Sequence, residues 1–192
     1  MARVILVTGS PGSGKSTVAH ALAKKLGIYH VIGTDTIREI LRACISKEKC
    51  PTLHNSAIML SDLAPHGEDK MIWGFKKQAL DVKPGIDAVV KRSIKEGKDI
   101  ILDGIHLIPG IIEKPKDAQY IHIVLKVTDE ERHIKQLTGQ AESRSSYKIE
   151  NLQKARAFQD YLLNMAKENN ALVLERTTVE KDVQEILKYL GD

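Results

Sequence analysis

The sequence predicts an α/β protein in which helices cover both faces of a central parallel sheet, giving three layers. Short runs of β-branched and aliphatic residues alternate with longer segments of helical spacing along the 192 residues. Hydrophobic residues make up 42% of the chain but aromatic residues only 4%. The core must therefore be built from aliphatic side chains, as in strands that are buried on both faces. This length suits one compact domain, and we expect a single domain over residues 1–192.

Five short apolar runs are the predicted strands. They cover residues 3–8, 29–32, 100–102, 120–127 and 171–174. The first and fourth runs are rich in valine and isoleucine, which fit a pleated and buried surface. Because helical segments separate successive strands, we expect parallel pairing.

Two helices are predicted in the first quarter of the chain. Apolar residues at helical spacing predict a helix over 16–26, and Gly27 is expected to end it. The next helix is expected to be capped by Thr34 or Thr36, because Thr36 and Glu39 have the spacing of a capping box. Its predicted buried face is formed by four aliphatic residues: Ile37, Ile40, Leu41 and Ile45.

The middle of the chain begins with its least regular part, residues 46–69, which prolines and a glycine interrupt. One short helix is expected there, around 55–63. A longer helix is then expected over about 69–82. Pro84 is expected to start a separate helix that ends at Gly97, because proline fits the first turn of a helix but not its interior.

Three more helices are predicted in the last third of the chain. Helical spacing places them over residues 129–137, 150–168 and 179–190. Residues 138–147, between the first two of these helices, are polar and contain glycine, so we expect a loop there.

The turn after the first strand, Gly9–Ser16, matches the phosphate-binding pattern G-x-x-x-x-G-K-[ST] at every position. Its glycines allow backbone torsions that turn successive N–H groups inward. The positive end of the following helix points at the same anion. Lys15 would reach the β- and γ-phosphates, and the Ser16 hydroxyl would bind Mg²⁺. The sequence therefore predicts a P-loop NTPase fold that binds ATP and Mg²⁺, with five strands in the kinase-like order 2-3-1-4-5 and a small lid.

Further residues of the nucleotide site follow from this loop. Asp103 ends the run IILDG and has the position of a Walker B acid, which would hold Mg²⁺ directly or through water. Thr177 and Thr178 follow the last strand, where the adenine usually lies. The predicted nucleotide-binding residues are Gly9, Ser10, Pro11, Gly12, Ser13, Gly14, Lys15, Ser16 and Thr17.

Other parts of the chain narrow the class of P-loop protein. GTPases need a guanine-reading N-K-x-D motif, and the sequence has none. Three segments, GTDTIRE at 33–39, PTLHNS at 51–56 and DGIHLIPG at 103–110, resemble the 2-phosphoglycerate kinase family. The late run 146–166 is also similar, with four residues at the spacing of that family: Tyr147, Arg156, Gln159 and Tyr161. The resemblance covers nearly the whole chain after the P-loop and implies conversion of 2-phosphoglycerate to 2,3-bisphosphoglycerate.

The helix after the second strand is where kinases of this class bind their acceptor. Asp35, Arg38 and Arg42 lie at positions i, i+3 and i+7, hence on roughly one face of that helix. Arg38 would bind a phosphate or carboxylate with both arms of its guanidinium. Asp35 would orient the attacking hydroxyl and accept its proton, although charge placement contributes more to phosphoryl transfer than a base does.

Two histidines are further candidates for acceptor binding. His106 follows Asp103 and would lie at the carboxyl end of a central strand, where ligands bind in such sheets. His54 lies in the irregular segment, which could fold over the acceptor. The acceptor-binding region is therefore expected over about 33–97.

The lid is expected over about 129–147, where a kinase needs cations that arrive late and exclude water. Arginines recur in this helix of the family, but this sequence has Lys135, Gln136 and Gln140 there. That departure weakens a direct transfer of activity and leaves three candidate cations: Arg132, Arg144 and Arg156. The predicted catalytic residues are Lys15, Asp35, Arg144 and Arg156.

The predicted function is an ATP-dependent phosphotransferase that acts on a small anionic metabolite. By resemblance this acceptor is 2-phosphoglycerate. Another phosphorylated or carboxylated metabolite or a nucleoside monophosphate is the alternative acceptor. A slow or non-enzymatic nucleotide-binding regulator is the alternative from another class, and a nucleic-acid end kinase is a third.

Bulk properties set the expected partners and location. The net charge of +4 fits anionic ligands, but the charges are scattered and aromatic residues are scarce, so we expect no nucleic acid. No apolar run reaches the length that spans a membrane, and the first residues lead straight into a strand. Cys44 and Cys50 match no metal or redox spacing and read as reduced thiols. We therefore expect a cytoplasmic protein without a membrane partner, and a monomer or homodimer.

Overall fold

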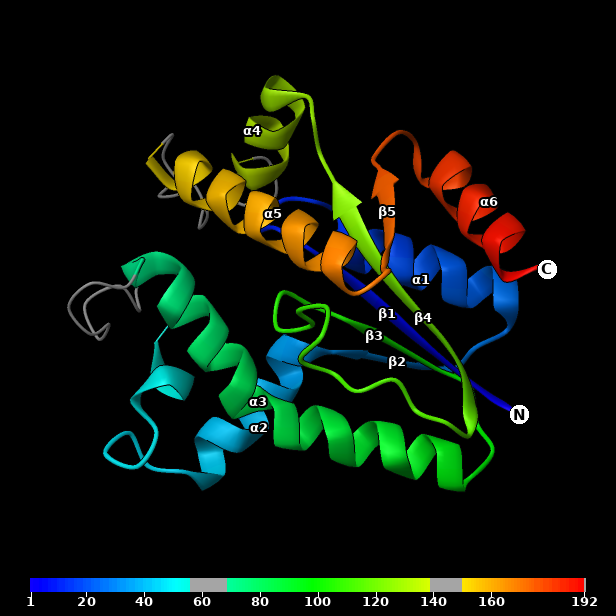
Figure 1. The fold of residues 1–192 in the computed structure, drawn as a ribbon, viewed down its shortest axis with the longest axis horizontal. Coiled ribbons are helices and arrows are strands. Elements are labelled where there is room, and N and C mark those ends of the chain that lie inside the picture. The colour runs from blue at the N-terminus through cyan, green and yellow to red at the C-terminus, as the bar shows by residue number, and fades with distance from the viewer. Residues whose placement is uncertain (56–68, 139–149, 192) are drawn as a thin grey trace.

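A computed structural model describes residues 1–55, 69–138 and 150–191 and contains a five-stranded parallel sheet between two layers of helices (Figure 1). The strands are β1 (Ala2–Gly9), β2 (His30–Gly33), β3 (Ile100–Asp103), β4 (Ala118–Lys126) and β5 (Leu172–Glu175). They are ordered β2-β3-β1-β4-β5, and every neighbouring pair is parallel. This confirms the predicted three-layer P-loop fold and its strand order.

The helices of the described residues follow the predicted alternation closely. They are α1 (Lys15–Leu26), α2 (Thr34–Cys44), η1 (Pro51–His54), α3 (Lys70–Lys95), α4 (Glu130–Thr138), α5 (Glu150–Glu168) and α6 (Val179–Leu190). Gly27 ends α1 in the left-handed conformation, as expected. The helix expected around 55–63 and the loop expected over 138–147 lie almost wholly outside the described residues.

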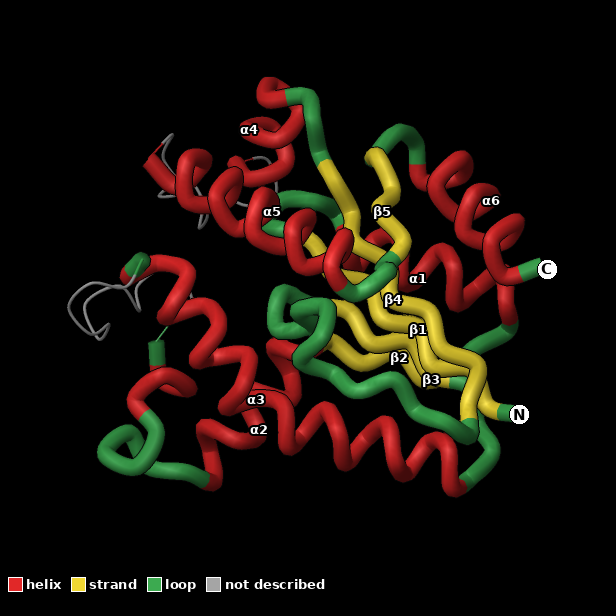
Figure 2. The backbone as a smooth tube through the Cα atoms, in the orientation of Figure 1, coloured by secondary structure: helices red, strands yellow, loops and turns green. Residues whose placement is uncertain are grey.

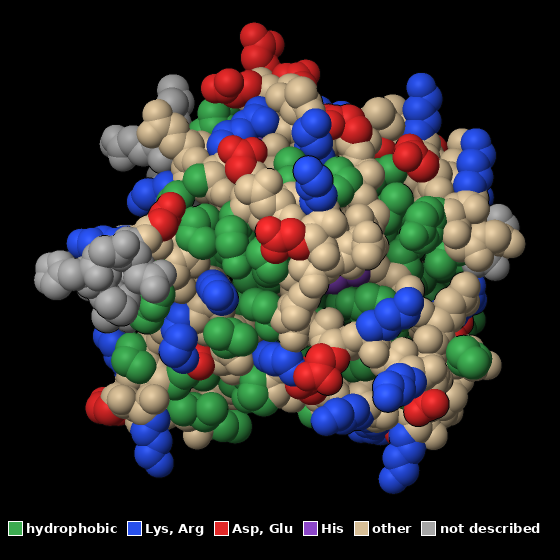
Figure 3. All heavy atoms as spheres, viewed as in Figure 1, with side chains coloured by type: hydrophobic (Ala, Val, Ile, Leu, Met, Phe, Trp, Pro, Cys, Tyr) green, Lys and Arg blue, Asp and Glu red, His purple; other side chains and the backbone are tan. Residues whose placement is uncertain are grey.

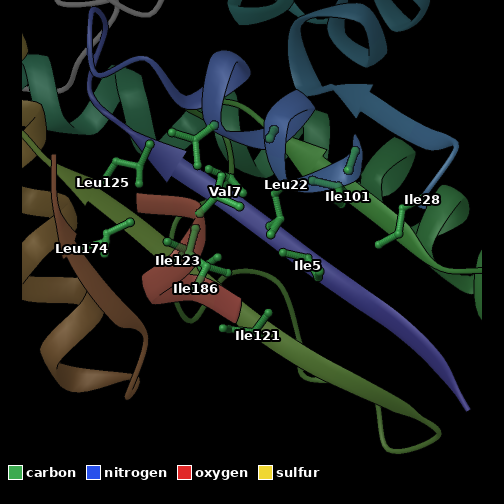
Figure 4. Packing of buried hydrophobic residues seen from close by; sticks show 14 residues of the cluster. Ile5, Val7, Leu22, Ile28, Ile101, Ile121, Ile123, Leu125, Leu174 and Ile186 are labelled. Carbon is green, nitrogen blue, oxygen red and sulfur yellow. The ribbon is translucent and has the colours of Figure 1, made fainter. Parts of the chain in front are cut away.

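Alternate residues of β1 enter two different cores. Ile5 and Val7 face α1 and α6, where they pack with aliphatic residues of β3, β4 and β5 (Figure 4). Val4 and Leu6 point to the opposite face and pack among residues of α2 and α3. Since β1 is buried on both faces, its sequence is almost continuously apolar rather than alternating.

The second helical layer is completed by α5, which lies beside α3. Phe75 of α3 and Phe158 of α5 are fully buried, and their ring centroids are 4.7 Å apart. Val124 of β4 packs in the same cluster. The two phenylalanines of the chain thus pack where two helices meet over β4, while the rest of the core is mainly aliphatic.

The structure corrects the prediction of two helices on either side of Pro84. Lys70–Lys95 forms one helix with Pro84 inside it, and this helix changes direction along its course (Figure 2), as a proline inside a helix causes. The carbonyl that loses its helical partner to the proline belongs to Leu80, a residue that is partly exposed. A Cβ built on Gly85 would lie 2.5 Å from Cγ2 of Ile37. Close packing against α2 therefore holds the bent helix in place.

The start and the buried face of α2 also differ from expectation. Gly33 precedes the first helical residue, and within the described residues no side chain caps this end of α2. Thr34 is buried, and its hydroxyl pairs with a histidine instead. Ile40, which was predicted to be buried, is 61% exposed. The helix lies at an edge of the sheet, so only a narrow side of it, formed by Ile37 and Leu41, contacts α3 and the core.

Charged residues are spread over the face seen in Figure 3. Lysine and arginine side chains are interspersed with aspartate and glutamate there and do not form a single stripe. In the described part of the chain, no helix combines the length and the apolar character that crossing a bilayer requires.

Candidate active site

A cavity of about 1020 Å³ lies at the carboxyl ends of β1, β2 and β3. Strand order reverses at this point, because β3 and β4 lie on opposite sides of β1. Ligands of open α/β sheets bind at such a position. The cavity is lined by residues from six regions: the P-loop and α1, β2 with the start of α2, Gln78 of α3, the turn after β3, α4, and the segment after β5.

The P-loop adopts a backbone that only glycine accommodates easily. Gly12 and Gly14 both have φ of 77°, and Gly14 is the residue before the first turn of α1. The Ser13 amide donates to the Ser10 carbonyl at 3.1 Å and closes the turn. The loop therefore ends at the amino terminus of a helix, where backbone amides and the helix dipole favour an anion.

Any residue with a Cβ would clash with its neighbours at two of the loop glycines. A Cβ on Gly9 would lie 2.5 Å from Oγ of Ser13, and a Cβ on Gly12 would lie 2.7 Å from Cγ of Leu137 in α4. His133, also of α4, donates from Nε2 to the Pro11 carbonyl at 2.8 Å. α4, the helix that was predicted to belong to a lid, thus packs directly on the P-loop.

Lys15 lies in the cavity wall on the first turn of α1. Its ammonium donates to the Ser10 carbonyl at 3.4 Å, so it reaches back over the loop. A γ-phosphate bound in the loop would lie within reach of this flexible cation.

Ser16 and Asp103 meet at the floor of the cavity. The Ser16 hydroxyl donates to the Asp103 carboxylate at 2.5 Å. The end of β3 is anchored because the Gly104 amide donates to the Val7 carbonyl at 3.1 Å. These are two adjacent oxygen ligands that suit Mg²⁺, which binds few protein groups and keeps several waters. Within residues 1–55, 69–138 and 150–191, no cluster of three or more acidic, histidine or cysteine side chains could hold an ion unaided.

The acceptor side of the cavity is formed by Asp35 and Arg38 of α2. The Asp35 side chain is 73% exposed, whereas that of Arg38 is only 17% exposed, and Arg38 Nε lies 4.0 Å from Asp35 Oδ1. Arg38 also donates to the Asn55 carbonyl at 2.9 Å and pairs with Glu39 at 3.0 Å. Its guanidinium is therefore held at the cavity wall by two parts of the structure, α2 and the residue after η1.

His106 is fully buried and does not line the cavity. Burial lowers its pKa to about 4, against the opposing effect of Asp35, so the ring is neutral at physiological pH. Nδ1 lies 2.8 Å from the Thr34 hydroxyl, and Nε2 lies 3.1 Å from Oε1 of Gln78. The structure thus places this histidine behind the acceptor side, with both nitrogens bound by protein groups.

The other two predicted acceptor residues also lie away from the cavity wall. His54 donates from Nε2 to the Ile45 carbonyl at 2.8 Å, which links η1 to the end of α2. Arg42 is half exposed and pairs with Glu39 at 2.9 Å. Of the acceptor set, the structure brings together Asp35 and Arg38 and leaves His54, His106 and Arg42 outside the lining.

Of the arginines predicted to act in the lid, one lines the cavity and one does not. Arg132 lines the cavity and donates to the carbonyls of Arg176, at 2.7 Å, and Thr177. Arg156 instead donates to the carbonyls of Val127, at 2.6 Å, and Thr128. It therefore braces the segment after β4 and does not face the cavity. Two other lid residues, Arg144 and Gln140, lie outside the described residues.

Arg176 is a cavity residue that the sequence analysis missed. It directly follows β5, is buried, and donates from Nε to the Ser13 carbonyl at 2.9 Å. Burial, together with the neighbouring Arg132, lowers its pKa. It forms an ion pair with buried Asp182 of α6, which also accepts from the Thr177 amide at 2.9 Å. The signal available in the sequence was an arginine at the carboxyl end of a parallel strand, where ligands bind.

Comparisons with known proteins agree with this geometry. The family model described as "AAA domain" matches residues 5–158. Proteins named 2-phosphoglycerate kinase are similar over nearly the whole chain. The one from Thermococcus kodakarensis is 34% identical over 95% of this chain and 64% of its own length, and the one from Pyrococcus furiosus is 35% identical over 96% and 63%. The predicted resemblance is confirmed, and the chain spans slightly less than two thirds of these relatives.

Solved structures share the fold at low sequence identity. Shikimate kinase from Acinetobacter baumannii in complex with shikimate superposes with a TM-score of 0.59 at 16% identity, over 100% of this chain and 94% of that one. A gluconokinase from Sinorhizobium meliloti gives 0.55 at 20% identity, over 98% and 91%. These neighbours support the architecture and say nothing about the acceptor.

Proposed function

Because this chain belongs to the AAA domain family, we propose that it is an ATP-dependent small-molecule kinase whose acceptor is 2-phosphoglycerate. The observation that carries the proposal is that one cavity joins a complete P-loop to the acceptor-side pair Asp35 and Arg38. The choice of acceptor rests on relatives named 2-phosphoglycerate kinase. The product would be 2,3-bisphosphoglycerate.

The nucleotide would occupy the side of the cavity formed by the P-loop and the segment after β5. Amides of the loop and the Lys15 ammonium would hold the β- and γ-phosphates. Arg132 and Arg176 line the same side and supply positive charge where the expected lid arginines are replaced. The adenine would lie near Thr177 and Thr178, which also line the cavity.

Mg²⁺ fits the adjacent oxygens of Ser16 and Asp103, which would hold it together with water and nucleotide oxygens. Bound there, the ion would neutralise charge that develops on the phosphates. The Ser16 hydroxyl donates its hydrogen to the Asp103 carboxylate and would offer an oxygen lone pair to the ion. Asp103 would hold the ion directly or through water.

The acceptor would approach from the α2 side. Arg38 would bind the phosphate or carboxylate of 2-phosphoglycerate with charge-assisted hydrogen bonds. The acceptor hydroxyl would attack the γ-phosphorus, the bond to the β–γ bridging oxygen would break, and ADP would leave. The hydroxyl proton would pass to Asp35 or to solvent. Asp35, whose side chain is exposed, would orient the hydroxyl as it enters.

ATP consumption in the presence of a panel of acceptors tests the proposal. ADP release is measured with no acceptor and with 2-phosphoglycerate, 3-phosphoglycerate, nucleoside monophosphates and shikimate. We expect selective stimulation by 2-phosphoglycerate. Stimulation by a different compound would reassign the acceptor. Nucleotide binding without stimulation by any of them would favour a nucleotide-binding regulator.

Arg38→Ala is expected to weaken the acceptor far more than ATP. Loss of a buried, charge-assisted pair at a binding site costs about 2–5 kcal/mol, which raises the KM for 2-phosphoglycerate by about 30-fold or more. The KM for ATP should change less than about threefold, because Arg38 lies on the acceptor side. Steady-state kinetics with each substrate varied separately measures both constants.

Two arginine variants accompany this test. Arg92→Ala removes an exposed arginine of α3 and should leave both KM values unchanged. Arg42→Ala decides whether Arg42 also binds the acceptor, as its helical spacing predicted. Equal weakening of both substrates by Arg38→Ala would contradict the placement of Arg38.

Asp103→Asn is expected to raise the Mg²⁺ concentration that gives half-maximal activity by about tenfold or more, since an amide oxygen binds the ion less strongly than a carboxylate. Titration of activity with Mg²⁺ at fixed ATP measures this shift. Asp117→Asn, which alters an exposed aspartate before β4, is the control. An unchanged midpoint in Asp103→Asn would remove Asp103 from the metal site.

Several expectations remain predictions under this proposal. They are a single domain over 1–192, a cytoplasmic location, a monomer or homodimer, and the absence of a nucleic-acid partner. Gel filtration and an oligonucleotide-binding assay at several salt concentrations test the last two.

A further inference from the structure

A buried polar network lies at the wall of the cavity beside Arg38. It is centred on Gln78 of α3, which lines the cavity but is only 1% exposed and lies on a mainly apolar face of the helix. Its amide nitrogen donates to the carbonyls of Thr52, at 2.6 Å, and Asn55, at 2.7 Å. Its Oε1 lies 3.1 Å from Nε2 of His106. One side chain thus joins α3, η1 and the turn after β3.

The donors and acceptors in this network fit one arrangement only. Because the Gln78 amide nitrogen faces two carbonyl oxygens, its Oε1 must face His106 and accept a hydrogen bond. His106 therefore carries its proton on Nε2, and Nδ1 accepts from the Thr34 hydroxyl. Every polar atom of the pair is satisfied in a fully buried place, so the network has a single orientation.

The network reaches Arg38 through a shared acceptor. The Asn55 carbonyl accepts from Gln78 at 2.7 Å and from Nη1 of Arg38 at 2.9 Å. A second link holds the same turn on α3, because the Thr52 hydroxyl donates to Asp81. The position of the Asn55 carbonyl, and with it one arm of the Arg38 guanidinium, is thereby fixed by Gln78.

We propose that Gln78 is a positioning residue for the acceptor: through the Asn55 carbonyl it fixes Arg38, and through His106 and Thr34 it fixes the start of α2. The proposal rests on the proposed function, since it assigns these residues to the acceptor side of that site. It gives His106 a defined part as the link between Gln78 and α2. The P-loop takes no part in these contacts, so nucleotide binding should be insensitive to them.

Gln78→Met tests the proposal, because methionine has a similar length but can neither donate to the carbonyls nor accept from His106. The KM for 2-phosphoglycerate is expected to rise on the order of tenfold, in line with the loss of one or two buried hydrogen bonds, while the KM for ATP changes less than about twofold. Gln184→Met, an exposed site on α6, should change neither. Thr34→Val should also raise the KM for 2-phosphoglycerate, though by less. Thr34→Ser, which keeps the hydroxyl, should have a KM close to that of the wild type.

A double variant separates positioning from a general loss of stability. If Gln78 acts through Arg38, then Gln78→Met should add little to the acceptor KM in an Arg38→Ala background. Full additivity of the two effects would overturn the proposal. Gln78→Glu, which keeps the acceptor for His106 but loses both donors, is the second variant should methionine prevent folding.

A measurement without substrate keeps this test independent of the proposed function. The Arg38 side chain is observed by ¹⁵N NMR, with its Nε–H resonance assigned from the Arg38→Ala spectrum. We expect an ordered guanidinium in the wild type and a mobile one in Gln78→Met. An ordered Arg38 in Gln78→Met would overturn the positioning role, even if 2-phosphoglycerate is confirmed as the acceptor. A mobile one would support that role, even if the acceptor proves to be another compound.

Discussion

Lys15→Ala is expected to lower acceptor-dependent turnover by about 10²–10³-fold, the effect of removing one well-placed group that stabilises the transition state. The ammonium reaches back over the P-loop and donates to the Ser10 carbonyl, so it lies where negative charge on the transferring phosphoryl would develop. Initial rates at saturating ATP and acceptor measure the loss. The fold should persist, because Lys15 lies at the cavity wall and not in the core.

Lys24→Ala is the matched control for this experiment. It removes an exposed lysine from the last turn of the same helix and should leave turnover unchanged. Circular dichroism and thermal unfolding of Lys15→Ala should match the wild type. Turnover within about threefold of the wild type in a folded Lys15→Ala protein would contradict the assignment of the P-loop to phosphoryl transfer.

Asp182→Asn is expected to lower the free energy of unfolding by about 3–5 kcal/mol, the usual cost of leaving a buried charge without its partner. The side chains of Arg176 and Asp182 are 3% and 1% exposed and form an ion pair. Asparagine keeps an oxygen for the Thr177 amide but removes the charge that balances Arg176. For a chain of this length the melting temperature should fall by about 10 °C, as measured by calorimetry or urea unfolding.

Two further variants serve as controls for the Asp182→Asn experiment. Asp160→Asn changes an exposed aspartate of α5 and should alter the free energy of unfolding by less than about 0.5 kcal/mol. Arg176→Met combined with Asp182→Leu removes both charges, so it should recover part of the stability lost in Asp182→Asn. An unchanged melting temperature in Asp182→Asn would show that the pair is not buried as described.

The fold and the placement of the P-loop and Asp103 at one cavity were accessible from the sequence because both depend on local patterns. The P-loop motif prescribes its own backbone, and the run IILDG after it identified the β3 strand and Asp103. Parallel strands with intervening helices allowed the sheet order to be predicted as well. These features involve residues that are close in sequence or that obey one topological rule.

The errors occurred where tertiary contacts override local preference. Pro84 signals a helix break, yet packing of Gly85 against Ile37 keeps α3 continuous. Ile40 has the spacing of a buried residue, but α2 lies at the sheet edge and leaves it exposed. The first outcome depends on a contact with a different helix and the second on where the helix lies against the sheet, and a sequence pattern carries no information about either.

In the predicted acceptor part of the candidate site, local position was again predicted correctly and tertiary contacts were not. His106 was chosen for its position after a strand, which is correct, but its ring turns into the protein to meet Thr34 and Gln78. Gln78 was overlooked, although a single amide side chain on the buried face of a long helix indicates a buried hydrogen-bond network. Arg176 was overlooked because its partner, the Ser13 carbonyl, lies 163 residues away.

Transfer of the γ-phosphoryl group is followed most directly by ³¹P NMR of a mixture of the protein, Mg-ATP and 2-phosphoglycerate. The expected result is loss of the γ-phosphate signal with matching growth of ADP and 2,3-bisphosphoglycerate, at a rate that Lys15→Ala lowers by about 10²–10³-fold. Persistence of the ATP and 2-phosphoglycerate signals under conditions where the folded protein is saturated with nucleotide would contradict it. Release of inorganic phosphate in place of the bisphosphate would also contradict it.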